Sequence, residues 1–202
     1  MNKRSLFIVF LSVIFIFVIA CESAVPAAPA IKKQGAQWTL ELPENIRKAI
    51  QAFDADFRPW ELKDYSPRIR NSYKESDPKE SPFALIVDIN NDGALDVIID
   101  GHDKKRDLLV SVVSDHTRYK VHIIKEGALS DPKTIENWNE KEKERGLNYY
   151  LWLNKDKTGV NKSVIFQVGY PQVEFEDGTA TDGALIEYLY EHGEFRQKVN
   201  EL

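Results

Sequence analysis

Residues 84–101 read Ala-Leu-Ile-Val-Asp-Ile-Asn-Asn-Asp-Gly-Ala-Leu-Asp-Val-Ile-Ile-Asp-Gly. Two apolar runs, rich in the β-branched residues that favour strands, enclose a short polar segment. Within that segment the spacing is D-x-N-x-D-G-x-x-D. Gly93 permits the positive φ that a sharp turn requires. The stretch predicts two strands joined by a tight loop whose side chains carry oxygen atoms.

The polar side chains of this loop are spaced so that a tight curl can turn their oxygens toward one point. A hard cation such as Ca²⁺ takes roughly 6–8 oxygen ligands at about 2.3–2.6 Å, and water can fill the positions that the protein leaves open. The loop holds no sulfur or imidazole, which argues against zinc and copper. We therefore predict a calcium site, with calcium preferred to magnesium. Its ligands are the side chains of Asp88, Asn90, Asp92 and Asp96 and the carbonyl of Ala94.

The flanks of the loop distinguish it from an EF-hand. That motif needs a bidentate Glu at position 12, where this chain has Ile99, and a helix on each side. The strand-loop-strand pattern instead resembles the calcium loop of FG-GAP or VCBS-type repeats, with 83–87 entering and 97–99 leaving. This resemblance covers about 20 of the 202 residues and implies Ca²⁺ bound by the ligand set given above. The alternative is an acidic Asn-Gly-type hairpin turn without metal.

The N-terminus has the pattern of a secretory signal. Lys3 and Arg4 precede an apolar run, 6–20, that ends in a small residue. The next residue is Cys21, the only cysteine of the chain. This arrangement resembles the bacterial lipobox, which implies cleavage after residue 20 and a diacylglycerol lipid on Cys21. The membrane is then a partner of the chain through that lipid.

Two other interpretations of the N-terminus stay open. The apolar run could be an uncleaved anchor, although about 15 residues fall short of the roughly 20 that a bilayer span prefers. A signal peptidase could instead cut after Ala28-Pro29-Ala30. Residue 22 is Glu rather than Asp, so the inner-membrane retention signal known from enteric bacteria is absent. We expect a lipid-anchored protein of the bacterial cell envelope, in the outer membrane if the source is Gram-negative.

Composition predicts one acidic domain behind a tether. Removing the signal peptide, 1–20, takes the formal net charge from −5 to −7, because two basic residues and no acid are lost. An acidic body argues against nucleic acid as a partner. The segment 21–36 contains Pro26, Pro29 and several alanines and is predicted to be the lipidated cysteine with its tether. The remaining residues, 37–202, suit a single globular domain.

The periodicity of the domain predicts an α+β fold that is mainly antiparallel β. An amphipathic helix over 43–58 begins near Pro43, because apolar residues follow at helical spacing. A β-rich region over 83–202 follows, and its short, closely spaced strands favour antiparallel pairing. We expect a small twisted sheet with the N-terminal helix packed on it, and a surface helix over 133–145. The strands are expected at 83–88, 95–100, 107–113, 119–124, 147–153, 163–168, 184–190 and 194–199, the last two joined by a turn at 191–193.

A faint second copy of the calcium-loop spacing lies at 154–162. In it Lys162 takes the place of the last carboxylate, Asp96, and an ammonium group there opposes a bound cation. If this segment is a second repeat, we expect it to have lost its metal. Its oxygen-bearing side chains are Asn154, Asp156 and Thr158.

Three further groups have a functional and a structural interpretation, and we favour the structural one for each. A cluster of aromatic residues could stack on a ligand or pack over the domain edge. His102 with Asp100 and Asp103 could be a general base beside the metal or an exposed turn. An acid-rich segment could hold a second cation or be a solvated loop. The aromatic residues are Trp60, Tyr65 and Tyr73, and the acidic ones are Glu174, Glu176, Asp177 and Asp182.

The catalytic motifs considered are missing. The chain has no G-x-S-x-G elbow, its four histidines lack H-E-x-x-H spacing, and its one cysteine is assigned to lipid. We therefore expect a calcium-binding, membrane-anchored extracytoplasmic module with a binding or structural role, whose partner is an envelope protein or a glycan. The alternative is a periplasmic or surface hydrolase that acts on a carbohydrate or phosphoester, with the calcium loop near its site.

Overall fold

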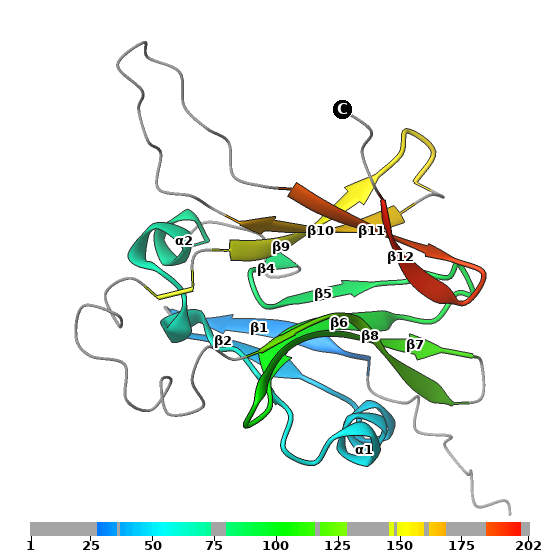
Figure 1. Cartoon of the computed structure of the whole chain (residues 1–202), viewed down its shortest axis with the longest axis horizontal. Coiled ribbons are helices and arrows are strands. Elements are labelled where there is room, and N and C mark those ends of the chain that lie inside the picture. Colours follow the sequence, from blue (N-terminus) through cyan, green and yellow to red (C-terminus); the bar gives the residue numbers. More distant parts are fainter. Residues whose placement is uncertain are drawn as a thin grey trace, which may run out of the picture.

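The computed structural model describes residues 28–35, 37–73, 80–115, 118–128, 146–147, 149–159, 162–168 and 185–198. In these ranges the fold is mainly antiparallel β with two short α-helices (Figure 1). The elements are β1 (Ala30–Gln34), β2 (Gln37–Glu41), α1 (Glu44–Phe53), β3 (Arg58–Pro59), the 3₁₀-helix η1 (Leu62–Asp64), α2 (Pro67–Ser72), β4 (Glu80–Ser81), β5 (Ala84–Val87), β6 (Asp96–His102), β7 (Arg106–Ser114), β8 (Tyr119–Ala128), β9 (Tyr149–Lys155), β10 (Lys162–Val168), β11 (Leu185–Glu191) and β12 (Glu194–Lys198).

The strands form three separate antiparallel sheets. A six-stranded sheet has the order β4-β5-β6-β7-β8, with β3 also paired to β6, and a four-stranded sheet has the order β12-β11-β10-β9. In Figure 1 the four-stranded sheet lies above the six-stranded one, and α1 lies below it. The prediction of a mainly antiparallel β fold with a packed N-terminal helix is confirmed. The prediction of a single small sheet is wrong, because β9–β12 form a sheet of their own.

Strands β5, β6 and β7 of the six-stranded sheet are buried on both faces, since successive side chains point to opposite faces and most of them are buried. Leu85 and Ile98 face the four-stranded sheet and pack with Leu151 and Val164. Residues whose side chains point to the other face of the sheet pack against α1 and the segment that follows it. They are Val97, Ile99, Leu108, Val110 and Val112. The strand that leaves the candidate loop is therefore held rigidly from two sides.

Helix α1 is shorter than the predicted 43–58. It begins after Pro43, as expected, and ends at Phe53, where the Asp54 N–H bonds to the Ile50 carbonyl at 2.9 Å. The chain then turns, because residues 58–59 pair with the end of β6. Phe57 lies outside the helix but is buried in the same apolar cluster as Ile50. The apolar pattern thus marked core residues correctly while overestimating the length of the helix.

The eight predicted strands from residue 83 onward correspond to β5–β12 with ends that differ by a few residues. The turn between β11 and β12 consists of His192 and Gly193, both with positive φ, which is the geometry of a two-residue type I′ hairpin. The hairpin β1–β2 was not predicted, and β1 occupies residues that were assigned to the tether. The predicted helix over 133–145 lies outside the described residues. Neither helix in the described ranges is long and apolar enough to span a membrane.

Candidate metal-binding loop

The candidate loop connects β5 to β6, whose residues Val87 and Asp96 are paired across the sheet. Its backbone curls tightly, because Asn91 has φ 59° and Gly93 has φ 88°. Only glycine adopts the second conformation without strain, while asparagine tolerates the first. The predicted strand-loop-strand arrangement is therefore present at the predicted place.

Two of the predicted ligands bring oxygen atoms to the same point of the loop. The Asp88 carboxylate accepts hydrogen bonds from the N–H groups of Asp92, at 3.1 Å, and Gly93, at 3.0 Å. The Asn90 side-chain oxygen accepts from the same Asp92 N–H at 3.1 Å. Because both oxygens bond to one nitrogen, they converge inside the curl rather than point into solvent.

Ser114, the last residue of β7, binds three of the predicted ligands. Its hydroxyl donates to the Asp92 carboxylate at 2.7 Å, and its N–H donates to Asp96 at 2.8 Å. Its carbonyl accepts from the Asn90 side-chain nitrogen at 2.8 Å. This last bond fixes the Asn90 amide with its oxygen turned into the loop. Sequence reasoning missed Ser114, because it lies in another strand and only the pairing of β6 with β7 brings it to the loop.

Asp96 closes the loop from inside the protein. It is fully buried, and its second oxygen accepts from the Ile89 N–H at 2.8 Å. Burial raises the pKa of Asp96 to about 6, three backbone hydrogen bonds oppose that rise, and the charge of Asp92 adds to it. This environment therefore disfavours the ionised form of the Asp96 carboxyl group, and a bound cation would stabilise that form.

The five predicted residues offer the oxygen-donor chemistry that a hard divalent cation prefers. Ala94 belongs to the same curl and donates its N–H to Asp92 at 2.8 Å. All the donors are oxygen atoms, and the loop contributes carboxylates, an amide and a carbonyl. In the described ranges no three His, Cys, Asp or Glu side chains by themselves form a metal-ligating group. A calcium ion here would rely on Asn90 and the Ala94 carbonyl as well, and it would supply two positive charges to the carboxylates.

The second, degenerate loop has a different arrangement. Asp156 accepts from the N–H and the hydroxyl of Thr158, at 3.0 and 2.7 Å, which forms a simple turn. Asn154 of β9 instead donates to Glu187 of β11 at 3.3 Å, across the intervening strand β10. Lys162 reaches from β10 to the first loop, where its ammonium group bonds to the Asp88 carbonyl and, at 2.7 Å, to the Asn91 side-chain oxygen. The two loops are thus neighbours in space.

The group around His102 is not an exposed turn, so that interpretation was wrong. His102 ends β6, and both Asp100 and Asp103 are buried. The group is also not beside the candidate metal loop, because Asp96 and His102 are the two ends of one strand, about 20 Å apart. The His102 Nδ1–H donates to the Asp103 carbonyl at 3.1 Å, which leaves Nε2 as the basic nitrogen.

The three aromatic residues are part of the core, which confirms the packing interpretation. Trp60, Tyr65 and Tyr73 are all buried. The Tyr65 hydroxyl donates to the Asp100 carboxylate at 3.1 Å, and Tyr73 makes an edge-to-face contact with Trp38, with ring centroids 6.2 Å apart. None of these three rings has a free face on which a ligand could stack.

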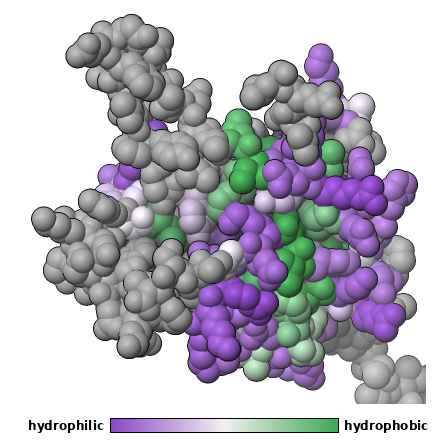
Figure 2. Space-filling view, viewed as in Figure 1, coloured by the Kyte–Doolittle hydropathy of each residue, from purple (hydrophilic) through white to green (hydrophobic). Residues whose placement is uncertain are grey.

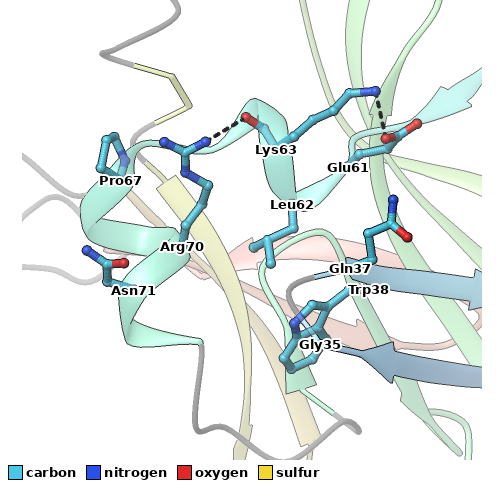
Figure 3. A pocket seen from close by; sticks show the side chains of 9 residues that line it. All are labelled: Gly35, Gln37, Trp38, Glu61, Leu62, Lys63, Pro67, Arg70 and Asn71. Atoms are coloured by element: carbon cyan, nitrogen blue, oxygen red, sulfur yellow. Dashed lines mark hydrogen bonds and ion pairs between the residues drawn. The ribbon is translucent and has the colours of Figure 1, made fainter.

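Two adjoining clefts lie beside the β1–β2 hairpin. One of about 430 Å³ lies between the hairpin, η1 and α2, and Figure 3 shows Leu62 pointing into it, with Arg70 bonded to the Lys63 carbonyl at its rim. The other, of about 680 Å³, is lined by Asp64 and His102. The described lining of this cleft contains no serine or cysteine, and His102 is the residue that it offers to the hydrolase alternative.

One face of the molecule carries exposed apolar side chains. In Figure 2 hydrophobic residues gather in a band through the middle of this face, between hydrophilic surfaces. By exposure alone, the large apolar residues that are exposed in the described chain are Leu95, Ile123 and Leu185, which belong to the β5–β6 loop, β8 and β11. Leu95 precedes the last predicted ligand, so apolar surface lies directly beside the candidate loop.

Cys21 and the acid-rich segment with Glu174, Glu176, Asp177 and Asp182 lie outside the described residues. Comparison of the chain with protein-family models, with curated proteins and with solved structures found no match. The interpretation of the candidate loop as a metal site therefore depends on the loop's own residues and geometry.

Proposed function

We propose that this chain is a calcium-stabilised, lipid-anchored module of the bacterial cell envelope with a binding or structural role. The observation that carries the proposal is the loop between β5 and β6. There the oxygens of Asp88 and Asn90 share one N–H donor, and Ser114 holds Asp92 and Asp96 beside them.

Calcium would stabilise this protein by binding only its folded state. The loop exists only when β5, β6 and β7 are paired, so the free energy of binding adds to the free energy of unfolding. A single cysteine cannot form an intramolecular disulfide, and lipid on Cys21 would occupy it. Extracytoplasmic calcium would then serve the bracing role that disulfides have in many exported domains.

The partner in this proposal is an envelope protein or a glycan. The apolar band in Figure 2 supports an interaction surface, because a contiguous exposed apolar patch on a folded domain often marks a contact site. The net charge of −5 supports the exclusion of nucleic acid.

Calorimetry on the full chain in detergent tests the calcium site. We expect the wild type to release or absorb heat on titration with CaCl₂ and to melt at a higher temperature with calcium than with a chelator. Asp92→Ala should lose most of that affinity and shift, because it removes a carboxylate that Ser114 orients toward the loop. Asp156→Ala, in the degenerate loop, is the matched control and should bind calcium like the wild type. A wild type without heat or melting shift would end the proposal.

Labelling with palmitate tests the anchor. Wild-type cells should incorporate the label into this chain, and Cys21→Ser should not, because the thiol that carries the lipid is gone. Equal incorporation into both would contradict lipidation at Cys21.

The hydrolase alternative is favoured by one observation, the basic nitrogen of His102 in a cleft of about 680 Å³. It predicts that the wild type hydrolyses a member of a panel of glycosides and phosphoesters. His102→Ala would abolish that turnover while the melting temperature changes little. Turnover that is equal in both proteins would exclude His102 as its base.

A further inference from the structure

Lys162 is bound to the candidate calcium loop although it belongs to the opposite sheet. It is the first residue of β10, and its ammonium group donates to the Asp88 carbonyl and to the Asn91 side-chain oxygen. Each of these acceptors lies in the first half of the loop. The half-buried lysine therefore connects the start of β10, in the four-stranded sheet, to the loop between β5 and β6 of the six-stranded sheet.

The charge of Lys162 matters because the loop is strongly acidic. Asp88, Asp92 and Asp96 lie within a few residues of each other, and the negative charge of Asp92 acts on Asp96. Without a cation these carboxylates repel one another, which favours opening of the loop. The nearby ammonium offsets part of this repulsion. It bonds to the main-chain carbonyl of Asp88 and not to the Asp88 carboxylate, which accepts the N–H groups of Asp92 and Gly93.

A bound calcium ion weakens this contribution. Its two positive charges offset two of the three carboxylate charges of Asp88, Asp92 and Asp96, and the ammonium group repels the ion at short range. Lys162 therefore stabilises the empty loop more than the occupied one. By linkage, a group that favours the empty state lowers the affinity for the ligand.

We infer that Lys162 is a built-in counter-cation that holds the empty loop against the second sheet and lowers its affinity for calcium. This inference rests on the proposed calcium site. In it, Lys162 sets the calcium affinity of that site although Lys162 is not one of the predicted ligands.

The test compares Lys162→Met with Lys155→Met, both in the full chain in detergent. Lys155 is the cross-strand partner of Lys162 and is exposed, so its substitution removes an equal charge from the neighbouring position. Titration with CaCl₂ should show about three- to tenfold tighter binding for Lys162→Met than for the wild type, and a less than about twofold change for Lys155→Met. With a chelator present, Lys162→Met should melt at a lower temperature than Lys155→Met.

A second variant separates charge from packing. Lys162→Arg keeps the charge and should bind calcium within about twofold of the wild type. The gain in calcium affinity of Lys162→Met over the wild type should decrease at about 1 M salt, where the Debye length is near 3 Å.

The outcomes distinguish the two claims. A wild type that binds no calcium overturns the proposed function, whereas the melting temperatures with chelator still report whether Lys162 holds the loop. A wild type that binds calcium, with Lys162→Met binding equally or more weakly, overturns only the inference. An equal gain in affinity for Lys162→Arg and Lys162→Met would do the same, because charge would then not be the cause.

Discussion

Asp100 is a carboxyl group enclosed by the protein, with 2% of its surface exposed. Tyr65 and Tyr149 both hydrogen-bond to it, and the nearby Asp107 opposes its ionisation. Burial is the largest cause, and it raises the pKa of Asp100 to about 8. The folded protein thus keeps a proton at neutral pH that the unfolded chain would release near its ordinary pKa of 3.8.

This difference predicts a stability that falls with rising pH. Between about pH 4 and pH 8 the folded state binds more protons than the unfolded state, so the free energy of unfolding decreases by at most about 1.4 kcal/mol per pH unit. Asp100→Asn should flatten this decrease, because the amide has no proton to lose. The measurement is urea denaturation at pH 5, 6, 7 and 8.

Asp56→Asn is the control for this series, since Asp56 is exposed and paired with Lys104. A residual slope should persist in Asp100→Asn, because burial also raises the pKa of Asp107. Parallel curves for Asp100→Asn and the wild type would show that Asp100 does not carry the effect.

Individual residues differ in how far the sequence predicts them. The loop residues could be placed because Asp88, Asn90 and Gly93 act locally, through spacing and backbone conformation. Asp100 was expected in an exposed turn because polar residues near glycine usually indicate one. Its burial depends on Tyr65, a contact between residues far apart in the chain, and local patterns contain no information about such contacts.

At the scale of elements, the close approach of β3 to β6 depends on a glycine. Gly101 is the cross-strand partner of Pro59. A Cβ atom on Gly101 would lie 2.3 Å from the Arg58 carbonyl oxygen and 2.7 Å from a ring carbon of Phe57. The first of these is backbone and cannot rotate away, so only glycine lets β3 pair at this position.

Gly101→Ala should therefore destabilise the protein by about 1–3 kcal/mol, the range for overpacking a tight interior. Gly127→Ala is the matched control, because Gly127 lies in β8 with no atom within 4 Å of the added methyl group. Its stability should change by less than about 1 kcal/mol. Guanidinium denaturation of both variants gives the comparison, and an equal midpoint for the two would contradict the steric role of Gly101.

The elements that could be predicted from the sequence are those whose apolar residues recur with the period of a strand or a helix. The strands β5–β8 and β9–β12 have apolar residues of high β propensity, and α1 has an amphipathic pattern. The hairpin β1–β2 was missed because the pattern of β1 is interrupted by Lys32 and Lys33, in a segment whose neighbours are proline and alanine. It is stabilised by contacts such as Trp38 with Tyr73, which join it to a distant part of the chain.

At the scale of the whole molecule, the two larger sheets share one apolar interior. Leu151 and Val164 of the four-stranded sheet pack with Leu85 and Ile98 of the six-stranded sheet. The sequence could not predict this stacking, because the pattern of alternating residues says which face of a strand is buried but not what covers it. We expect the two sheets to unfold together, since neither has another cover for its inner face.

Leu151→Ala tests this shared interior. Leu151 is 1% exposed, and its truncation should cost about 2–5 kcal/mol while unfolding stays a single transition. Leu185→Ala, at a residue that is 52% exposed, should change stability by less than about 0.5 kcal/mol. Fluorescence and circular dichroism should give coincident unfolding curves for each protein. Two separated transitions would mean that the sheets are independent units.

If Cys21 carries the proposed lipid, the early start of β1 limits where the protein can work. The first described strand begins at Ala30, nine residues after Cys21. Fully stretched, that connection reaches about 30 Å. With its lipid in a bilayer, the β body would therefore stay within one domain diameter of the headgroups, and any binding partner would have to approach the membrane surface to meet it.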